Sequence, residues 1–465
     1  MSVDLSVPLS WKNATGDAAA MLEELQPNIL KAHVRDHLAI LFLRFDDAKA
    51  ARTFLTRLVP LMKSAKAHLT EVEAFKKDRV AGTPYVGLGL SAEAYRKLGA
   101  PGTPGDQLFG AGAKNAVPRL KDPRVADWEV PYREVVDAVV LIGDADEAPV
   151  KTTRRKVKAL LSRGITVLGE ETGLAQLNKN GEGIEHFGYV DGRSQPLFLT
   201  EDIENEKRTT DGINEWDPSA ALDRVLVPDT AAPNPAVHFG SYFVFRKLEQ
   251  NVRLFKQAEQ DLADALELRG DDRERAGAML VGRFEDGTPL TLQREPGAES
   301  PVGNDFSYFS DDLGQKCPFQ AHIRKTNPRG SGGFEQPEEE RRHLFPRRAQ
   351  TYGRRLDPPN ASLPPVVRPT GGVGLLFMAF NSDLAGQFEF IQQTWANNDQ
   401  FPAVPPGHKA PGLDLVIGQG ERLESTFAPV WGAGGDQAVA PAPQAVTMKG
   451  GEYFFMPSLA FLRSL

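Results

Sequence analysis

The sequence predicts an α+β protein built from two ferredoxin-like halves, each a layer of strands covered by helices. Strand-like apolar runs alternate with amphipathic helix-like runs, and the order of elements starts again in the second half of the chain. None of these strands is followed by a glycine-rich dinucleotide-binding motif. The chain has 465 residues, which is long for one typical core and favours two domains.

The first half has the clearer pattern. Its predicted strands are residues 37–45, 84–90, 137–146 and 165–171. Its predicted helices are residues 47–62, 91–99 and 148–163, in which apolar side chains recur at helical spacing. In the second of these helices, Ser91 stands at the N-cap position and Gly99 at the end, as is typical of short helices.

The second half repeats the pattern with longer connections. Strands are expected at 241–248 and 373–380, and helices at 249–268 and 384–398. Two long stretches, 285–315 and 325–370, look irregular, and irregular segments of this length in a compact domain usually carry function. We place the domain boundary in the polar stretch 201–235. The predicted domains are residues 1–215 and 216–465, both ferredoxin-like.

Composition excludes several classes of protein and of site. The formal net charge of -8 argues against a general nucleic-acid binder, which needs a basic face. Cys317 is the only cysteine, so the chain can form no internal disulfide and no zinc site with several cysteines. The N-terminal segment lacks a basic start followed by an apolar core, and no apolar run is long enough to span a membrane. We therefore expect a cytoplasmic protein.

The common nucleotide-binding, hydrolase and metalloprotease motifs are absent, but one histidine stands in an unusual setting. His322 lies among apolar residues and is followed by three cations, the last of them Arg329. A second basic pair, Arg347 and Arg348, comes shortly afterwards. Taken singly, these residues read as a core histidine and a solvated surface pair. Taken together, they suit a haem, whose iron accepts an axial histidine and whose propionates attract arginine.

The stretch FGYVDGRSQP, residues 187–196, contains a second candidate. Asp191 followed by Gly192 is an ordinary turn signal. The turn either only reverses the chain or also directs the Asp191 carboxylate at a reacting group.

FGYVDGRSQP resembles the GxxDG signature of the dye-decolorizing peroxidases, with Gly188, Asp191 and Gly192 at its fixed positions. Four further stretches resemble blocks of that family in the same order: 281–290, 304–329, 347–353 and 374–380. The resemblance extends from about residue 25 to residue 459. The long intervening segments are similar to those of the larger bacterial subgroup with extended loops.

The resemblance implies a fold, a cofactor and an activity. The fold would be a duplication like the dimeric α+β barrel, with one haem b per chain in the C-terminal domain and the GxxDG motif in the N-terminal one. The activity would be oxidation of dyes, phenols or other aromatic donors by hydrogen peroxide.

The resemblance also implies roles for individual residues. His322 would ligate the iron, while Asp191 and Arg347 would promote heterolytic cleavage of the peroxide. An adjacent arginine favours the ionised form of a carboxyl group, which is the form that accepts a proton. The remaining cofactor contacts would come from a propionate partner, a close backbone approach and an apolar distal lining, namely Arg329, Gly192, Leu375 and Phe377.

Several points stay open at the level of sequence. Asp383 is the first choice for a carboxylate behind His322, with Glu389 in reserve, although Asp383 equally suits a helix N-cap. A bulky dye would need an oxidisable side chain at the surface, for which Trp395 and then Tyr352 are candidates. The physiological reductant, oxidation of Mn(II) and the oligomeric state are undetermined.

Two alternative functions remain in view. The first is a haem carrier or haem-processing protein with incidental peroxidase activity, and the second is a cargo protein enclosed in a shell. Asp191 together with Arg347 argues against a carrier, since transport needs neither residue.

Overall fold

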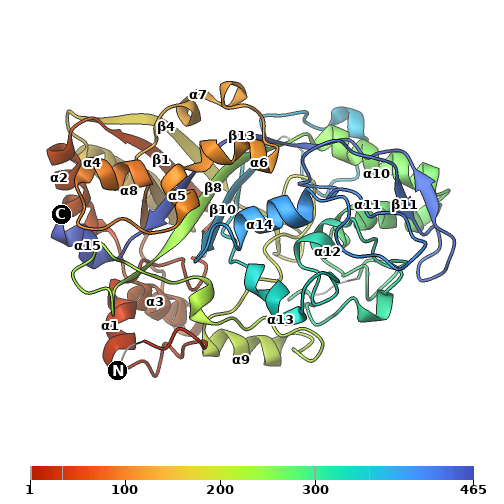
Figure 1. The fold of residues 1–465 in the computed structure, drawn as a ribbon, viewed down its shortest axis with the longest axis horizontal. Helices are drawn as coiled ribbons and strands as arrows, with labels where there is room; N and C mark the ends of the chain where they lie inside the picture. Colours follow the sequence, from red (N-terminus) through yellow and green to blue (C-terminus); the bar gives the residue numbers. More distant parts are fainter. Residues whose placement is uncertain (1–2, 34, 298–299, 356) are drawn as a thin grey trace.

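The computed structural model describes residues 3–33, 35–297, 300–355 and 357–465, and in it strands from both halves of the chain join one sheet. The strand order is β10-β9-β4-β1-β3-β2-β13-β8-β7, and an additional pairing of β10 with β8 closes the sheet into a barrel (Figure 1). All the neighbouring pairs are antiparallel. The predicted α+β class is thereby confirmed. The strands of this sheet are β1 (His37–Phe45), β2 (Tyr85–Leu90), β3 (Ala138–Asp144), β4 (Ile165–Leu174), β7 (Val227–Pro228), β8 (Phe239–Gln250), β9 (Gln350–Tyr352), β10 (Gly374–Asn381) and β13 (Val446–Met456).

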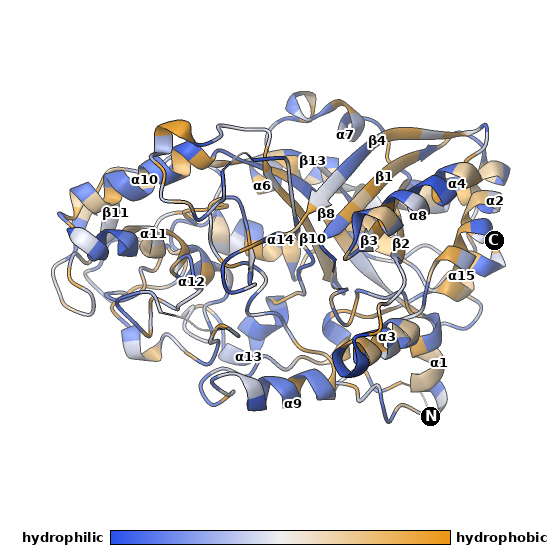
Figure 2. Cartoon of the chain, turned by 180° about the vertical axis from the view of Figure 1, so that it is seen from behind, coloured by the Kyte–Doolittle hydropathy of each residue, from blue (hydrophilic) through white to orange (hydrophobic). Residues whose placement is uncertain are grey.

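Helices of the first half cover the outer face of the barrel where the sequence predicted them. They are α2 (Ala48–Leu58), α4 (Ala92–Leu98) and α8 (Glu147–Leu160). The Ser91 hydroxyl accepts a hydrogen bond from the Ala94 amide, and Gly99 ends α4 in the left-handed conformation, so both capping predictions are confirmed. Figure 2 shows the strands coloured mostly as apolar, with polar residues on the outer helices.

Further helices enclose the barrel and its connections. Helices α1 (Gly16–Glu24) and α3 (Ala65–Asp78) pack against each other and contribute Met21, Leu22 and Leu69 to the apolar core that the inner face of the sheet forms. The others are α5 (Gln107–Ala111), α6 (Val117–Leu120), α7 (Val130–Arg133), α9 (Thr200–Thr209), α13 (Pro337–Glu340) and α15 (Leu459–Ser464).

The second half places a separate group of helices beside the strands β8, β10 and β13, at the end of the molecule away from the two termini (Figure 1). These are α10 (Val252–Ala265), α11 (Glu274–Val281), α12 (His322–Thr326) and α14 (Phe388–Phe390). Because side chains alternate along a strand, Leu376 and Met378 of β10 enter the barrel core, whereas Leu375 and Phe377 face a cavity under these helices.

The expected helix at 384–398 is wrong in its first part. Regular helix begins only at Phe388 and continues as a π-helical segment, Ile391–Ala396. Gln387 leaves the helical conformation (φ -121°, ψ -87°), and its side-chain amide donates to the carbonyls of Arg224 and Leu344. The residues before Phe388 thus anchor the segment through side chains.

In their described part, the two stretches predicted to be irregular contain only short elements, namely 3-10 turns, the end of α12, the four-residue helix α13 and the three-residue strand β9. Residues 298, 299 and 356 fall within them and lie outside the described residues. Both stretches contribute to the wall of the cavity, for example through Tyr308, Arg329 and Arg347. In the part of the chain that the structure describes, no helix is long and apolar enough to cross a membrane.

Candidate active site

A cavity lies between the outer face of β8 and β10 and the helices α12 and α14, with an empty volume of about 1770 Å³ counted out to its mouth. Its wall is largely apolar and includes Leu248, Ile323, Leu375 and Phe377. A small number of ionisable side chains interrupt this wall: Glu185, Asp191, Arg193, Arg246, Arg283, His322, Arg329 and Arg347. Cofactor sites commonly combine apolar walls with few charged groups in this way.

His322 begins α12 and is held by a buried carboxylate. Its Nδ1 lies 2.9 Å from Asp414 Oδ2, and Asp414 is fully buried. Since an ionised carboxylate only accepts hydrogen bonds, Nδ1 carries the proton and Nε2 keeps its lone pair. The side chain is 29% exposed and lines the cavity, and Nε2 bonds to no described residue. His322 is therefore oriented as a metal ligand is, with the second ring nitrogen fixed by an acceptor.

The charges of His322 and Asp414 stabilise their hydrogen-bonded pair, as the shifts of both pKa values indicate. Burial alone would lower the pKa of His322, but the charge of Asp414 and its hydrogen bond outweigh burial and raise that pKa. Burial likewise opposes ionisation of Asp414, yet the charge of His322 and the amide N–H groups of Val416 and Ile417 hold the pKa of Asp414 below its ordinary value. The pair favours an ionised Asp414.

The prediction that Asp383 or Glu389 backs His322 is wrong. Asp383 Oδ1 accepts from the Gly386 amide at 3.0 Å and so closes a turn, but Asp383 is not the helix N-cap either, because α14 begins only at Phe388 with Gln387 before it. Glu389 is occupied by Arg119 and by the Tyr453 hydroxyl, which donates to it at 2.9 Å. Asp414 was missed, although an isolated carboxylate inside the apolar run LDLVI signals a buried partner.

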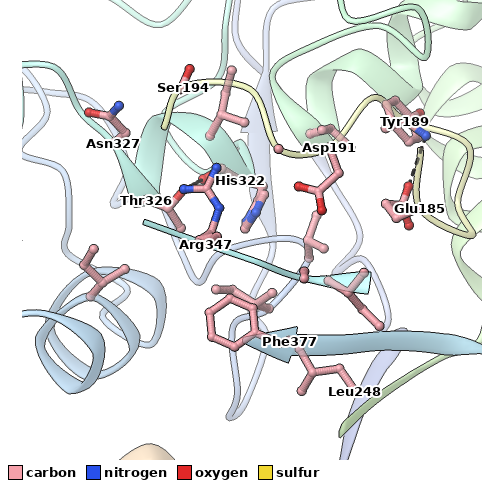
Figure 3. A pocket seen from close by; sticks show the side chains of 18 of the residues that line it. Glu185, Tyr189, Asp191, Ser194, Leu248, His322, Thr326, Asn327, Arg347 and Phe377 are labelled. Carbon is pink, nitrogen blue, oxygen red and sulfur yellow. Dashed lines mark hydrogen bonds between the residues drawn. The ribbon is translucent and has the colours of Figure 1, made fainter. Parts of the chain in front are cut away.

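Asp191 lies on the cavity wall at the end of a tight hairpin. Its amide donates to the Gly183 carbonyl at 2.9 Å, whereas its carboxylate is exposed to the cavity and bonds to no described residue. Gly192 follows with φ +82°, a conformation that favours glycine, and no heavy atom lies within 4 Å of where its Cβ would stand. Figure 3 shows the Asp191 carboxylate directed into the cavity. The backbone is fixed while the carboxylate stays free.

Arg347 is attached to the same loop as Asp191. Its amide donates to Gln195 Oε1 at 2.8 Å, and its Nη2 donates to the Arg193 carbonyl at 3.0 Å. Burial lowers the pKa of Arg347, and the charge of Asp191 partly offsets this. Figure 3 shows Arg347, His322 and Asp191 around the same cavity. The three residues singled out by the sequence thus meet in one cavity.

Two further arginines of the wall, Arg329 and Arg283, are buried without a carboxylate partner among the described residues. Arg329 donates to the Asn304 and Phe306 carbonyls and to the Ser194 hydroxyl, and Arg283 donates to the Gly287 and Gly303 carbonyls. Burial lowers the pKa of Arg329 to about 9 and that of Arg283 to about 10. Buried cations without a counter-charge are costly, so these two suit the paired carboxylates of a haem. The residues present fit that group.

The candidates for surface oxidation are not at the surface. Trp395 is 1% exposed, with its ring stacked on Phe401 at 5.1 Å and set edge-on to His343 at 5.3 Å. Tyr352 is 7% exposed. The expectation that Trp395 lies at the surface is wrong, and Asn397, two residues further on, is also buried and hydrogen-bonded to Leu120, Gln392 and Gln419.

A closed antiparallel barrel covered by helices, with a cavity on its outer face, is the architecture of a dimeric α+β barrel, and comparisons identify the family. A family model described as "DyP dimeric alpha+beta barrel domain" matches residues 24–175. The multifunctional dye peroxidase DyP2 of Amycolatopsis sp. (strain ATCC 39116 / 75iv2) is 68% identical over 466 residues, covering 100% of both chains, and its solved structure matches with a TM-score of 0.98. The chain belongs to the dye-decolorizing peroxidase family and is a peroxidase.

Two other solved structures are also similar. A DyP-type peroxidase from Anabaena sp. is 35% identical, with a TM-score of 0.91 over 99% of this chain and 98% of that one. A dye-decolorizing peroxidase in complex with 2,6-dimethoxyphenol is 26% identical, with a TM-score of 0.78 over 95% of this chain and 98% of that one. Members of this family are haem enzymes.

Proposed function

We propose that this chain is a haem b peroxidase that uses hydrogen peroxide to oxidise dyes, phenols and related aromatic donors, with one haem in the cavity described above. The observation that carries the proposal is the presence of Asp191 and Arg347 in the same cavity as the free Nε2 of His322. The name of DyP2 and the bound 2,6-dimethoxyphenol of a more distant structure support aromatic donors.

His322 would bind the iron through Nε2, with Asp414 keeping the ring in the required tautomer. Arg329 and Arg283 would pair with the propionates, and Leu375 and Phe377 would form an apolar wall on the peroxide side. The exposed turn at Gly192 leaves space for a flat ring to approach the backbone. When bound, haem supplies the electrons that reduce the peroxide O–O bond.

The protein's own part in the reaction is proton transfer and charge stabilisation. The Asp191 carboxylate accepts the proton from one peroxide oxygen and returns it to the other, so that the departing oxygen leaves as water. A single residue can perform both steps only if it starts ionised and is free to turn, and no hydrogen bond to a described residue restrains this carboxylate. The Arg347 guanidinium stabilises the negative charge that develops as the bond breaks heterolytically.

An absorption spectrum of the haem-loaded protein, before and after one equivalent of hydrogen peroxide, tests the proposal. We expect a Soret band that changes within the mixing time and returns when a phenol is added. A Soret band that never responds to peroxide would favour the haem carrier. Absence of the band in haem-supplied protein would favour a cargo role.

One finer proposal concerns the organisation of the chain. The division into residues 1–215 and 216–465 keeps Asp191 and His322 in different domains, so that the catalytic cavity would be shared between them. Oxidation of Mn(II) and oligomer formation, which the sequence left undetermined, are not decided by the structure. In the described part of the chain, no group of three His, Cys, Asp or Glu side chains is assembled to hold a metal ion.

A further inference from the structure

Trp431 differs in exposure from every other readily oxidised aromatic side chain of this protein. All eight tyrosines and the tryptophans at 11, 128, 216 and 395 are buried, whereas Trp431 is partly exposed. It lies in the loop between β11 (Ser425–Phe427) and β12 (Gln437–Val439), at the same end of the molecule as α11 (Figure 1). A donor too bulky for the cavity can approach this indole from solvent.

A short chain of hydrogen bonds joins Trp431 to the cavity wall. Its Nε1–H donates to the Leu290 carbonyl at 2.9 Å, and the Leu290 amide donates to the Gly282 carbonyl at 3.1 Å. Gly282 packs against Ile323, because a Cβ at Gly282 would stand only 2.3 Å from Ile323 Cγ1. Ile323 lines the cavity beside His322. Two hydrogen bonds and one van der Waals contact thus connect an exposed indole with the cavity.

Three loops that hydrogen bonds join near Trp431 each carry an exposed apolar side chain. Leu292 lies two residues after Leu290, whose carbonyl accepts from the Trp431 indole. Leu313 lies two residues before Gln315, whose carbonyl accepts from the Gly432 amide at 3.1 Å. Leu292 is 47% exposed, Leu313 38% and Val430 59%. We call these three side chains and Trp431 the donor patch. An exposed apolar surface of this kind commonly marks a binding site.

A cation accompanies the donor patch. The Lys316 ammonium lies 5.1 Å from the centre of the Trp431 ring and has no ion-pair partner among the described residues. A flat aromatic anion can lie on the apolar side chains while its sulfonate or carboxylate pairs with Lys316. Neutralising the ammonium also makes the indole easier to oxidise, because a nearby positive charge opposes removal of an electron.

We propose that Trp431 is the site where bulky anionic aromatic donors, such as sulfonated dyes, deliver their electrons. Trp431 gives one electron inward to the enzyme that peroxide has oxidised and regains one from the docked donor, so the indole is unchanged over the cycle. Two donors are each oxidised by one electron for every peroxide reduced to two waters. This inference rests on the proposed peroxidase function.

The test compares haem-loaded Trp431→Phe with wild type and with Trp11→Phe. Trp11 is a matched control, because a lysine ammonium, that of Lys66, also lies over its ring at 4.9 Å, but Trp11 does not line the cavity. With a disulfonated anthraquinone dye, we expect Trp431→Phe to lower kcat at least tenfold and Trp11→Phe to leave it unchanged. The stopped-flow rate of the reaction with peroxide should be the same in all three proteins.

Two further measurements do not depend on the Phe variant. Lys316→Gln should weaken calorimetric binding of the dye, without peroxide, by about 1.5- to 5-fold, the range for one exposed ion pair, and leave binding of an uncharged dye unaltered. Wild-type protein treated with peroxide and a nitroso spin trap, without donor, should carry the adduct on Trp431 in peptide mass spectra.

Dye turnover by Trp431→Phe within twofold of wild type would overturn the assignment, as would adducts found only on other residues. Equal losses of dye turnover and of the peroxide reaction would assign Trp431 to packing alone and also overturn it. By contrast, a wild-type protein that does not react with peroxide would refute the peroxidase function itself.

Discussion

Replacing Asp191 with Asn removes the proposed proton carrier and little else. The carboxylate bonds to no described residue, and the loop around it is held by backbone groups such as the Asp191 amide. Asn has nearly the same shape and leaves no donor or acceptor unsatisfied. We therefore expect the free energy of unfolding to change by no more than about 0.5 kcal/mol, as for other substitutions without lost contacts.

The kinetic cost should be far larger than the cost in stability. Loss of a positioned acid–base group costs about 10²- to 10⁴-fold in rate, which corresponds to about 2.7–5.5 kcal/mol of barrier. The rate loss for Asp191→Asn should lie in the upper part of this range. Of the two carboxylates on the cavity wall, Asp191 has no hydrogen bond to a described residue, whereas Glu185 accepts three and so cannot readily replace Asp191.

The assay is stopped-flow mixing of haem-loaded wild-type protein and Asp191→Asn with hydrogen peroxide, followed by haem absorbance. Haem content is determined in parallel, since the substitution should not change it. A second-order rate constant within tenfold of wild type, at equal haem content, would refute the role assigned to Asp191.

Four further substitutions probe the rest of the cavity. Arg347→Leu should slow the peroxide reaction by about 10²- to 10³-fold and, because it leaves the Arg193 carbonyl without its donor, lower the free energy of unfolding by about 1–3 kcal/mol in chemical denaturation. Asp414→Asn should weaken haem retention or turnover by about 10- to 100-fold, which is the usual cost of losing a partner of a metal ligand, and a haem-transfer assay measures the retention. His322→Ala should abolish stable haem binding. Wild-type haem content in His322→Ala would contradict the assignment of His322 as the iron ligand. Burial raises the pKa of Glu185 to about 7, above its ordinary 4.5. Between pH 4.5 and 8, the free energy of unfolding of haem-free wild type should therefore fall by about 3 kcal/mol relative to that of Glu185→Gln. Equal dependence of the free energy of unfolding on pH in the two proteins would contradict this.

The sign of the last effect follows from proton binding. A folded-state pKa above the unfolded value means that the folded protein holds the proton more tightly. The stabilisation from Glu185 is then complete below about pH 4.5 and is lost as the pH rises through 7. Denaturant titrations of both proteins at several pH values measure this difference directly.

The sequence was most informative where structure is local. The strands of the first half, the α4 cap at Ser91 and its end at Gly99 depend on neighbouring residues, and all lie where the pattern predicted. Asp191, His322 and Arg347 were found through motifs with fixed internal spacing. Their meeting in one cavity could be expected only from the family resemblance, because Asp191 is more than a hundred residues from both His322 and Arg347 along the chain.

The errors came from contacts that no local pattern encodes. Asp414 is 92 residues from His322, and only the folded chain makes them neighbours. Asn397 looked like the polar end of an exposed helix, but its amide donates to the Leu120 carbonyl in the first half of the chain. This contact buries the end of the segment and, with it, Trp395. Polar side chains that serve as internal hydrogen-bond partners cannot be told from surface residues by composition.

The functional side chains on the two sides of the cavity are held differently, so substitutions on each side should have different effects. On the peroxide side, Glu185 accepts the amides of Phe187 and Tyr189 at 2.8 and 3.0 Å, so the loop is fixed and the Asp191 carboxylate is left free. On the other side, the His322 ring itself is held by Asp414. A group that moves protons must change its partners in each turnover, whereas a metal ligand must not. Substitutions of Asp191 should therefore alter the rate with the cofactor retained, and substitutions of Asp414 should alter retention of the cofactor as well.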